Sequence, residues 1–138
     1  MPVRMELSRI LIHDNTPSHI IELREVGGER VFPIWIGQYE AAAIERRLSN
    51  RPVSRPQTHE LLSNVIRDLG GQLDHILVND LIKEEPAGGT FMAQLVINTD
   101  GKQVKIDSRP SDAIALGIAT DVPIYVAEHV IDQASKPS

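Results

Sequence analysis

Residues 39–44 read Tyr-Glu-Ala-Ala-Ala-Ile, and residues 111–116 read Ser-Asp-Ala-Ile-Ala-Leu. Both stretches favour a helix and carry an acidic residue in the first turn, where a negative charge suits the helix dipole. Each follows two extended runs that are joined by a glycine-containing turn, so a hairpin followed by a helix occurs twice, over 19–48 and 91–119. This repeat predicts an internally duplicated α+β unit with mostly antiparallel strands.

Glycine and proline divide the chain into further elements around this repeat. We expect Thr58 to cap the second helix, Asp100-Gly101 to form a hairpin turn, and Pro110 to occupy the first turn of the third helix. The strands are predicted over 5–13, 19–26, 30–36, 73–82, 90–98, 102–107 and 122–126, and the helices over 38–48, 58–69, 110–120 and 127–134. Residues 1–134 then form one domain, with residues 135–138 as a disordered tail.

Composition excludes several classes of function. The 138-residue chain has no cysteine, which excludes a disulfide scaffold, a thiolate zinc site and a cysteine nucleophile. Aromatic residues make up 4%, few for a protein that stacks single-stranded bases, and the net charge of −5 argues against a surface coated for non-specific DNA binding. No apolar run suggests a membrane span or a secretory signal, so we expect a cytoplasmic protein with no membrane partner.

Three segments carry a resemblance to a known family. Residues 55–62 read Arg-Pro-Gln-Thr-His-Glu-Leu-Leu, residues 107–116 read Asp-Ser-Arg-Pro-Ser-Asp-Ala-Ile-Ala-Leu, and residues 123–128 read Pro-Ile-Tyr-Val-Ala-Glu. Together they resemble the bifunctional nuclease family, over about residues 4–134. The resemblance implies duplicated strand–helix–strand units that form a curved, mostly antiparallel sheet with helices packed on it. It also implies self-association and activity on both DNA and RNA.

The segment 107–112 is the densest candidate for chemistry. It lies where a strand ends and a helix begins, so free backbone N–H groups and the helix dipole favour an anion there. Arg109 can hold a phosphate in a bidentate grip, and Asp107 and Asp112 could be catalytic carboxylates that ligate Mg²⁺ or Mn²⁺. The alternative is a helix cap, with Ser108 or Arg109 at the N-cap and an ion pair between Asp107 and Arg109.

His59, at the start of the second helix, is the candidate general acid or base, because imidazole gains and loses a proton near neutral pH. The alternative is an exposed first-turn histidine, or one that donates to a neighbouring carbonyl. We expect one pocket to gather Asp107, Arg109 and Asp112 with His59 and Arg55, so that two helix N-termini face one anion.

Four arginines form a basic stretch in this acidic chain. They are candidate contacts to the phosphates of a nucleic acid: Arg46, Arg47, Arg51 and Arg55. The alternative is that arginines at a helix C-terminus complement the dipole and the following loop is solvated.

The sequence therefore predicts a nuclease that hydrolyses phosphodiester bonds in DNA and RNA, with no organic cofactor. The alternative is a non-enzymatic regulatory or scaffold protein that binds a partner or a small anion at the same helix N-terminus. Phe32 and Trp35 are predicted on opposite sides of a strand near Pro33, which exposes apolar surface. We therefore expect a homo-oligomer, most simply a dimer.

Overall fold

The computed structural model of the chain describes residues 1–12, 18–50, 54–83 and 89–135, and its elements follow the predicted order. The strands are β1 (Val3–Leu11), β2 (Ser18–Glu25), β3 (Val31–Gly37), β4 (Gln72–Lys83), β5 (Gly89–Thr99), β6 (Lys102–Ser108) and β7 (Ile124–Val126). The helices are α1 (Gln38–Leu48), α2 (Thr58–Asp68), α3 (Pro110–Thr120) and α4 (Glu128–Ala134). No helix in the described ranges is long and apolar enough to cross a membrane.

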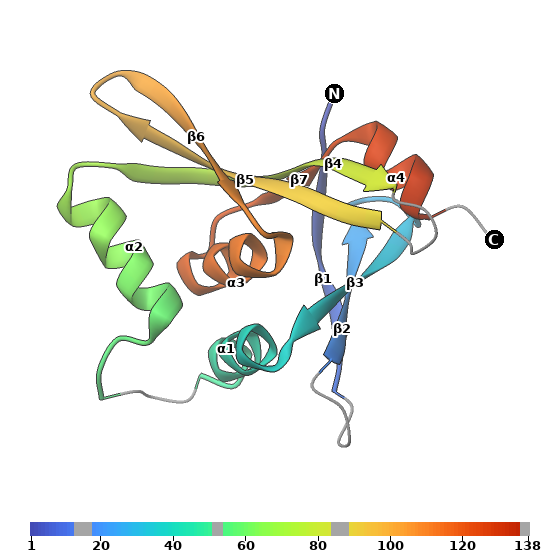
Figure 1. The fold of residues 1–138 in the computed structure, drawn as a ribbon, viewed down its shortest axis with the longest axis horizontal. Coiled ribbons are helices and arrows are strands. Elements are labelled where there is room, and N and C mark those ends of the chain that lie inside the picture. The colour runs from blue at the N-terminus through green and yellow to red at the C-terminus, as the bar shows by residue number, and fades with distance from the viewer. Residues whose placement is uncertain (13–17, 51–53, 84–88, 136–138) are drawn as a thin grey trace.

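The strands form one sheet in the order β3-β2-β1-β7-β4-β5-β6 (Figure 1). Each half of the sheet is a three-stranded antiparallel meander followed by a helix: β1-β2-β3-α1 in the first half and β4-β5-β6-α3 in the second. Strand β7 lies between the halves, antiparallel to β1 and parallel to β4. The predicted duplicated α+β fold with a mostly antiparallel sheet is confirmed.

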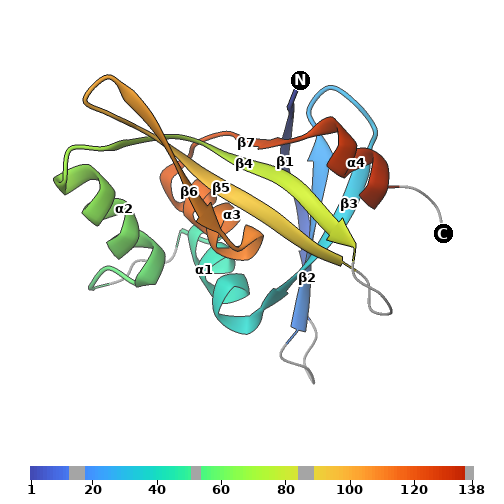
Figure 2. The same cartoon turned by 45° about the horizontal axis from the view of Figure 1, so that its top comes forward.

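The sheet curls around α1 and α3, which pack against each other in the hollow of the curl (Figures 1 and 2). Residues of both helices, of α4 and of the inward face of the strands form one buried hydrophobic cluster. Phe32 of β3 stacks on Phe91 of β5 with ring centroids 5.7 Å apart, so the two halves also meet across the core. On β3, Phe32 is buried and Trp35 is exposed, as predicted.

Helix α3 has the most buried sequence of the four helices, and its surroundings explain this. Pro110 occupies its first turn, as predicted, and Asp121 ends it in the left-handed conformation. A Cβ atom on Gly117 would lie 2.9 Å from Cγ1 of Ile76 on β4. The absence of a side chain at Gly117 therefore allows α3 to lie close against the sheet.

The turn between β5 and β6 has the chemistry that the sequence predicts. Asp100 and Gly101 both have positive φ, 51° and 73°, which is the conformation that a two-residue hairpin turn requires. The pairing of β5 with β6 continues without a register shift from Thr99↔Lys102 to Ala93↔Ser108. The second hairpin therefore delivers the chain directly to the start of α3.

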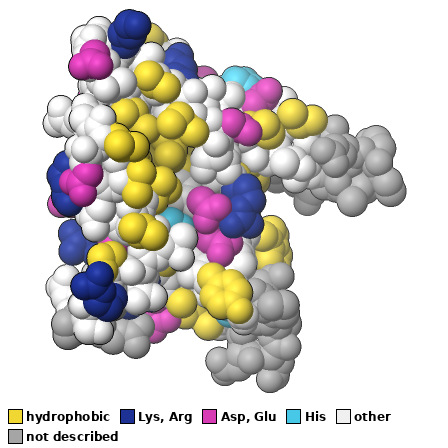
Figure 3. All heavy atoms as spheres, turned by 60° about the vertical axis from the view of Figure 1, so that its left-hand side comes forward, with side chains coloured by type: hydrophobic (Ala, Val, Ile, Leu, Met, Phe, Trp, Pro, Cys, Tyr) yellow, Lys and Arg dark blue, Asp and Glu magenta, His cyan; other side chains and the backbone are white. Residues whose placement is uncertain are grey.

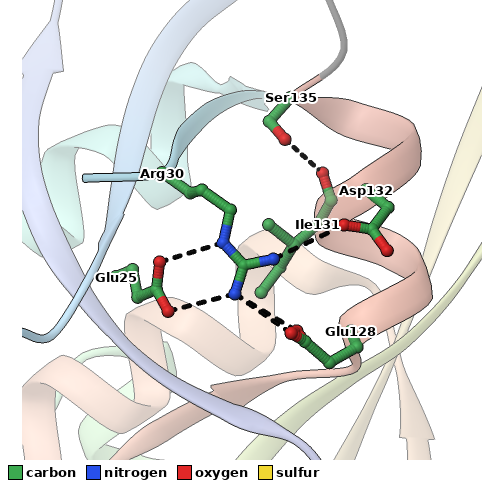
Figure 4. Close-up of polar contacts among 6 residues, drawn as sticks. All are labelled: Glu25, Arg30, Glu128, Ile131, Asp132 and Ser135. Atoms are coloured by element: carbon green, nitrogen blue, oxygen red, sulfur yellow. Dashed lines mark hydrogen bonds and ion pairs between the residues drawn. The ribbon is translucent and has the colours of Figure 1, made fainter. Parts of the chain in front are cut away.

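Arg30 ties the turn between β2 and β3 to α4 (Figure 4). Its guanidinium donates to both oxygens of Glu25, at 2.9 and 3.0 Å, and to the carboxylate of Glu128 at 3.0 Å. A longer contact of 3.4 Å reaches Asp132. The hydrogen bond from Arg30 lowers the pKa of Glu25 below its usual range, and the hydrogen bonds to Glu25 and Glu128 raise the pKa of Arg30.

Two details of the predicted elements differ in the structure. Gln57, and not Thr58, is the N-cap of α2, and its backbone N–H donates to the Glu60 side chain at 3.0 Å. Of the predicted tail, Ser135 closes α4 by donating its hydroxyl to the Ile131 carbonyl at 2.6 Å. Residues 136–138, and residue 13 of the first predicted strand, lie outside the described residues.

Candidate active site

Three helices begin at the same place, and a cavity of about 450 Å³ lies between their first turns. Helix α1 contributes the second and third residues of its first turn and, farther along, Ala42, Ala43 and Arg46. Helix α2 contributes its N-cap and first two residues, and α3 contributes its third residue and the residue before the helix. The polar side chains on the wall include Tyr39, Glu40, Arg46, His59, Arg109 and Asp112. The sequence predicts two converging helix starts, and the structure brings a third to them.

His59 is a buried group on the wall of this cavity, with 6% of its surface exposed. Its Nε2 lies 3.2 Å from Oδ1 of Asp112, so the second residue of α2 is bonded to the third residue of α3. When Nε2 donates to the carboxylate, the other ring nitrogen, Nδ1, is the one that remains to exchange a proton. A histidine and a carboxylate thus form the kind of pair that orients imidazole for proton transfer.

Arg109 binds the other oxygen of the Asp112 carboxylate. Its Nε and Nη2 donate to Oδ2 of Asp112 at 3.0 and 2.7 Å, and Nη2 lies 3.6 Å from Oε1 of Glu40. The hydrogen bond to Asp112, and then its negative charge, raise the pKa of Arg109, so the guanidinium stays charged. The predicted alternative, an ion pair between Asp107 and Arg109, is not the pair that forms.

Glu40 is the residue that the sequence-based site omitted. It is 7% exposed, and both Glu40 and Asp112 are the third residue of their helices, α1 and α3. The duplication therefore places two equivalent carboxylates within reach of the same nitrogen of Arg109, Nη2. The sequence contained the signal, because the repeat aligns these two acids, but it did not indicate that both face one cavity.

The four arginines of the basic stretch do not share one surface. Arg46 lines the cavity, with Nη2 3.9 Å from Oε1 of Glu60. Arg47 points elsewhere, because its Nε donates to the Ile118 carbonyl at 3.4 Å and it lines a different cavity. Arg55 is exposed and absent from the cavity wall, and Arg51 lies outside the described residues.

Asp107 also lies away from the cavity wall. It is an exposed residue of β6, paired with Gln94 of β5. Both oxygens of Asp112 are already bonded to His59 and Arg109. Among the described residues, no group of three His, Asp or Glu side chains is placed to hold a metal ion. The donor set does not fit a Mg²⁺ or Mn²⁺ site built on Asp107 and Asp112, so we derive no step through a metal.

The charges on the cavity wall favour an anion. Two carboxylates, Glu40 and Asp112, offset two guanidinium groups, Arg46 and Arg109. Three helix N-termini then add about half a positive charge each. Figure 3 shows acidic and basic side chains side by side on this part of the surface, next to a histidine and a band of hydrophobic side chains. A phosphate can therefore approach this cavity despite the net charge of −5.

The curled sheet and this cavity define a class of protein: a duplicated α+β domain with a buried histidine–carboxylate pair where three helices begin. The family model for the bifunctional nuclease domain matches residues 21–138. The chain therefore belongs to the bifunctional nuclease domain family, as the three segments of the sequence predict.

Individual relatives differ in how much of their length this chain matches. An uncharacterized protein of Mycobacterium tuberculosis is 39% identical over 132 residues, which are 96% of this chain and 74% of that protein. Bifunctional nuclease 2 of Oryza sativa subsp. japonica is 27% identical over 116 residues, 83% of this chain and 35% of the plant protein. Bifunctional nuclease 1 of Arabidopsis thaliana is 24% identical over 121 residues, 85% and 36% of the two chains.

Proposed function

We propose that the protein is a nuclease that hydrolyses phosphodiester bonds in DNA and RNA at the cavity between α1, α2 and α3. The observation that carries this proposal is the buried His59, held at 3.2 Å by a carboxylate that also binds Arg109. Membership of the bifunctional nuclease domain family supports the class of reaction. The names of the plant relatives support it further, over the part of their length that this chain matches.

Each side chain has a role that follows from its position. Arg109 uses Nε and Nη2 on Asp112, which leaves Nη1 to bind a phosphoryl oxygen, and Arg46 adds a second positive charge on the wall. Asp112 fixes the orientation of the His59 ring through the contact at Nε2. Glu40 adds a second carboxylate 3.6 Å from Nη2 of Arg109, so that the guanidinium is placed before the substrate arrives.

The reaction can be written with these groups alone. A water oxygen attacks phosphorus, the bond from phosphorus to the leaving oxygen breaks, and protonated His59 donates its proton to that oxygen. The proton lost by the attacking water passes to solvent, and solvent protonates His59 again. Asp107 and a divalent ion have no step in this scheme. The expectation that Mg²⁺ or Mn²⁺ takes part remains a prediction, and EDTA tests it.

The experiment compares two histidines that make the same kind of bond. His129 Nε2 lies 3.1 Å from Oδ1 of Asp80, but this pair is exposed and does not line the cavity that contains His59. Highly purified wild type, His59→Gln and His129→Gln are incubated with labelled DNA and RNA, with and without EDTA. We expect His59→Gln to lower the rate by about 10²–10⁴-fold, the usual contribution of a positioned acid or base, and His129→Gln to leave it unchanged.

A rate that survives in both His59→Gln and the double variant Asp107→Ala/Asp112→Ala contradicts the proposal, because the activity then comes from another site or a contaminant. Equal loss in His129→Gln would contradict it as well, since that pair does not touch the cavity. Loss of activity in EDTA with full recovery in Mn²⁺ would instead support a metal-dependent route.

A non-enzymatic role is the second candidate, and one observation favours it. Both oxygens of Asp112 are engaged by His59 and Arg109, so the same network could serve only to hold three helix starts together. Binding of an oligonucleotide without cleavage, at an affinity that His59→Gln leaves unchanged, would support this regulatory or scaffold role.

Two further expectations belong with this proposal. We propose that the protein is a homo-oligomer, most simply a dimer formed by a second copy at the exposed edge of β6. A cytoplasmic location fits the proposed substrates, and cell fractionation tests it.

A further inference from the structure

The exposed aromatic residues are concentrated at the site. All five aromatic side chains lie in described parts of the chain, and three of them are wholly or partly covered: Phe32, Phe91 and Tyr125. The other two, Trp35 and Tyr39, are 64% and 77% exposed. Large exposed rings lose the free energy that burial would provide, so a pair of them on a small surface points to a binding role.

The two rings lie on either side of the cationic group. Tyr39, the second residue of α1, lines the cavity that contains His59. Trp35 points outward from β3 and lines an adjoining cavity of about 450 Å³ between β3 and the start of α3. Glu40 and Arg109 are on the walls of both cavities, so the order across the surface is ring, guanidinium, ring.

We propose that Trp35 and Tyr39 are stacking platforms for unpaired bases, so that single-stranded DNA or RNA is the preferred substrate class. This inference rests on the proposed function, because it places the scissile phosphate at Arg109. Successive bases of a single strand are separated by a phosphate, which matches a guanidinium between two rings. Every base has a π-face, so such stacking tolerates any sequence, and in a duplex those faces are already stacked.

The low aromatic content of the chain, taken alone, argues against this kind of binding. What matters is where the rings lie. Three of the five contribute to the interior, and both remaining rings border the same arginine. Two platforms suffice for a short contact of two bases beside one phosphate.

Trp35 makes the test direct, because it is the only tryptophan of the chain. A twelve-nucleotide oligo-dT or oligo-rU is titrated into the protein in EDTA, and tryptophan fluorescence and fluorescence anisotropy are measured. We expect the single strands to quench Trp35 and to bind more tightly than a blunt duplex of equal length. Tyr39→Ala should weaken single-strand binding by about 5- to 150-fold, the range for one lost base stack, and Tyr39→Phe should retain the affinity.

Leu69→Ala is the matched control, because Leu69 is an exposed apolar residue beyond the far end of α2. It should change neither quenching nor affinity. Circular dichroism melts of all variants show whether each one is folded.

The outcomes separate this inference from the proposed nuclease activity. If single strands quench Trp35 fluorescence and Tyr39→Ala weakens their binding, but no cleavage occurs, the stacking proposal is supported and the nuclease proposal fails. If His59-dependent cleavage occurs but Tyr39→Ala and Trp35→Ala leave single-strand affinity and duplex discrimination unchanged, the stacking platforms are overturned. Quenching that depends on protein concentration without any oligonucleotide would also overturn them, because a second copy would then cover the rings.

Discussion

Arg46 and Arg47 are neighbours in the sequence, yet their side chains line different cavities. Arg46 faces the cavity, and Arg47 donates to the Ile118 carbonyl beside another cavity. In a linear stretch of arginines the two are equivalent, but on a helix adjacent residues point about 100° apart. The position on the helix, and not the local density of charge, decides which arginine can meet a phosphate.

We therefore predict different salt dependence for two adjacent substitutions. Arg46→Gln should weaken oligonucleotide binding about equally for all sequences and flatten the slope of log K against log salt by about 0.7–0.9, the loss of one phosphate contact. Arg47→Gln should leave the slope unchanged. Anisotropy titrations at several salt concentrations measure both. Equal flattening in the two variants would mean that the whole arginine stretch follows the nucleic-acid backbone.

Residue-level prediction from the sequence succeeded where a signal was local. Pro110, Asp112 and His59 were recognised because their types and positions suit a helix start. The place of Glu40 was missed, since nothing in its own neighbourhood indicates that α1 packs on α3 and turns it toward Arg109. The helix-cap alternative paired Arg109 with Asp107, whereas the first helical turn brings Asp112, three residues away, within 2.7 Å.

At the scale of elements, the close packing of α3 on β4 depends on Gly117. Gly117→Ala would gain about 1 kcal/mol from helix propensity, but the new Cβ would lie 2.9 Å from Cγ1 of Ile76. Overpacking of a dense core costs about 1–3 kcal/mol, so we expect a net loss of stability. Urea denaturation followed by circular dichroism measures it. A gain of about 1 kcal/mol would mean that α3 shifts freely on the sheet.

The attachment of α4 to the turn between β2 and β3 should depend on pH. The pKa of Glu25 is lower in the folded protein than its usual value of about 4.3, so its bond to Arg30 contributes stability above that pH. This contribution is lost as the pH falls through the folded pKa of Glu25. We expect Arg30→Met to melt below the wild type at pH 7, with a difference that shrinks toward pH 3.

The control for this substitution is Arg67→Met, because the side-chain partners of Arg67 among the described residues are polar neighbours on its own helix, Asn64 and Asp68. Its melting temperature should follow the wild type at every pH. A difference between wild type and Arg30→Met that stays constant from pH 7 to pH 3 would show that packing of the arginine, and not its charge, attaches α4.

Element prediction was accurate because the boundaries are marked by residues with special backbone requirements. Asp100-Gly101 fixed one hairpin, and Pro110 fixed the start of α3. The order of the strands in the sheet could not be predicted from the sequence. The sequence predicts β7 as a short strand, but its neighbours in the sheet, β1 and β4, lie far from it along the chain. Pairing between distant segments depends on the whole packed sheet, and no local pattern encodes it.

For the whole molecule, the two edges of the sheet predict how a second copy binds. Edge strand β3 contains Pro33, which cannot donate a ladder hydrogen bond, whereas β6 is regular and contains no proline. Its Val104 and Ile106 are exposed. If two β6 strands pair antiparallel around Ile106, Lys105 of each copy lies opposite Asp107 of the other, so the edge is complementary to itself.

We expect light scattering at micromolar concentrations to give twice the 15.3 kDa of one chain. Lys105→Glu should shift the mass toward one chain, because it would place two acids opposite each other. The double variant Lys105→Glu/Asp107→Lys restores the complementarity and should restore the dimer, with an unchanged net charge. A single-chain mass for the wild type, or a dimer that persists in Lys105→Glu, would contradict dimerisation through the edge of β6.

The position of β7 has a consequence for how the chain reaches its fold during synthesis. Among the described strands, β7 alone pairs with both β1 and β4, and Val3 pairs with Val126. The first meander emerges from the ribosome early, but the free edge of β1 has no partner until residues 124–126 are made. Each newborn chain therefore carries an open strand edge through most of its translation, and this is the interval in which misassembly with another chain is most probable.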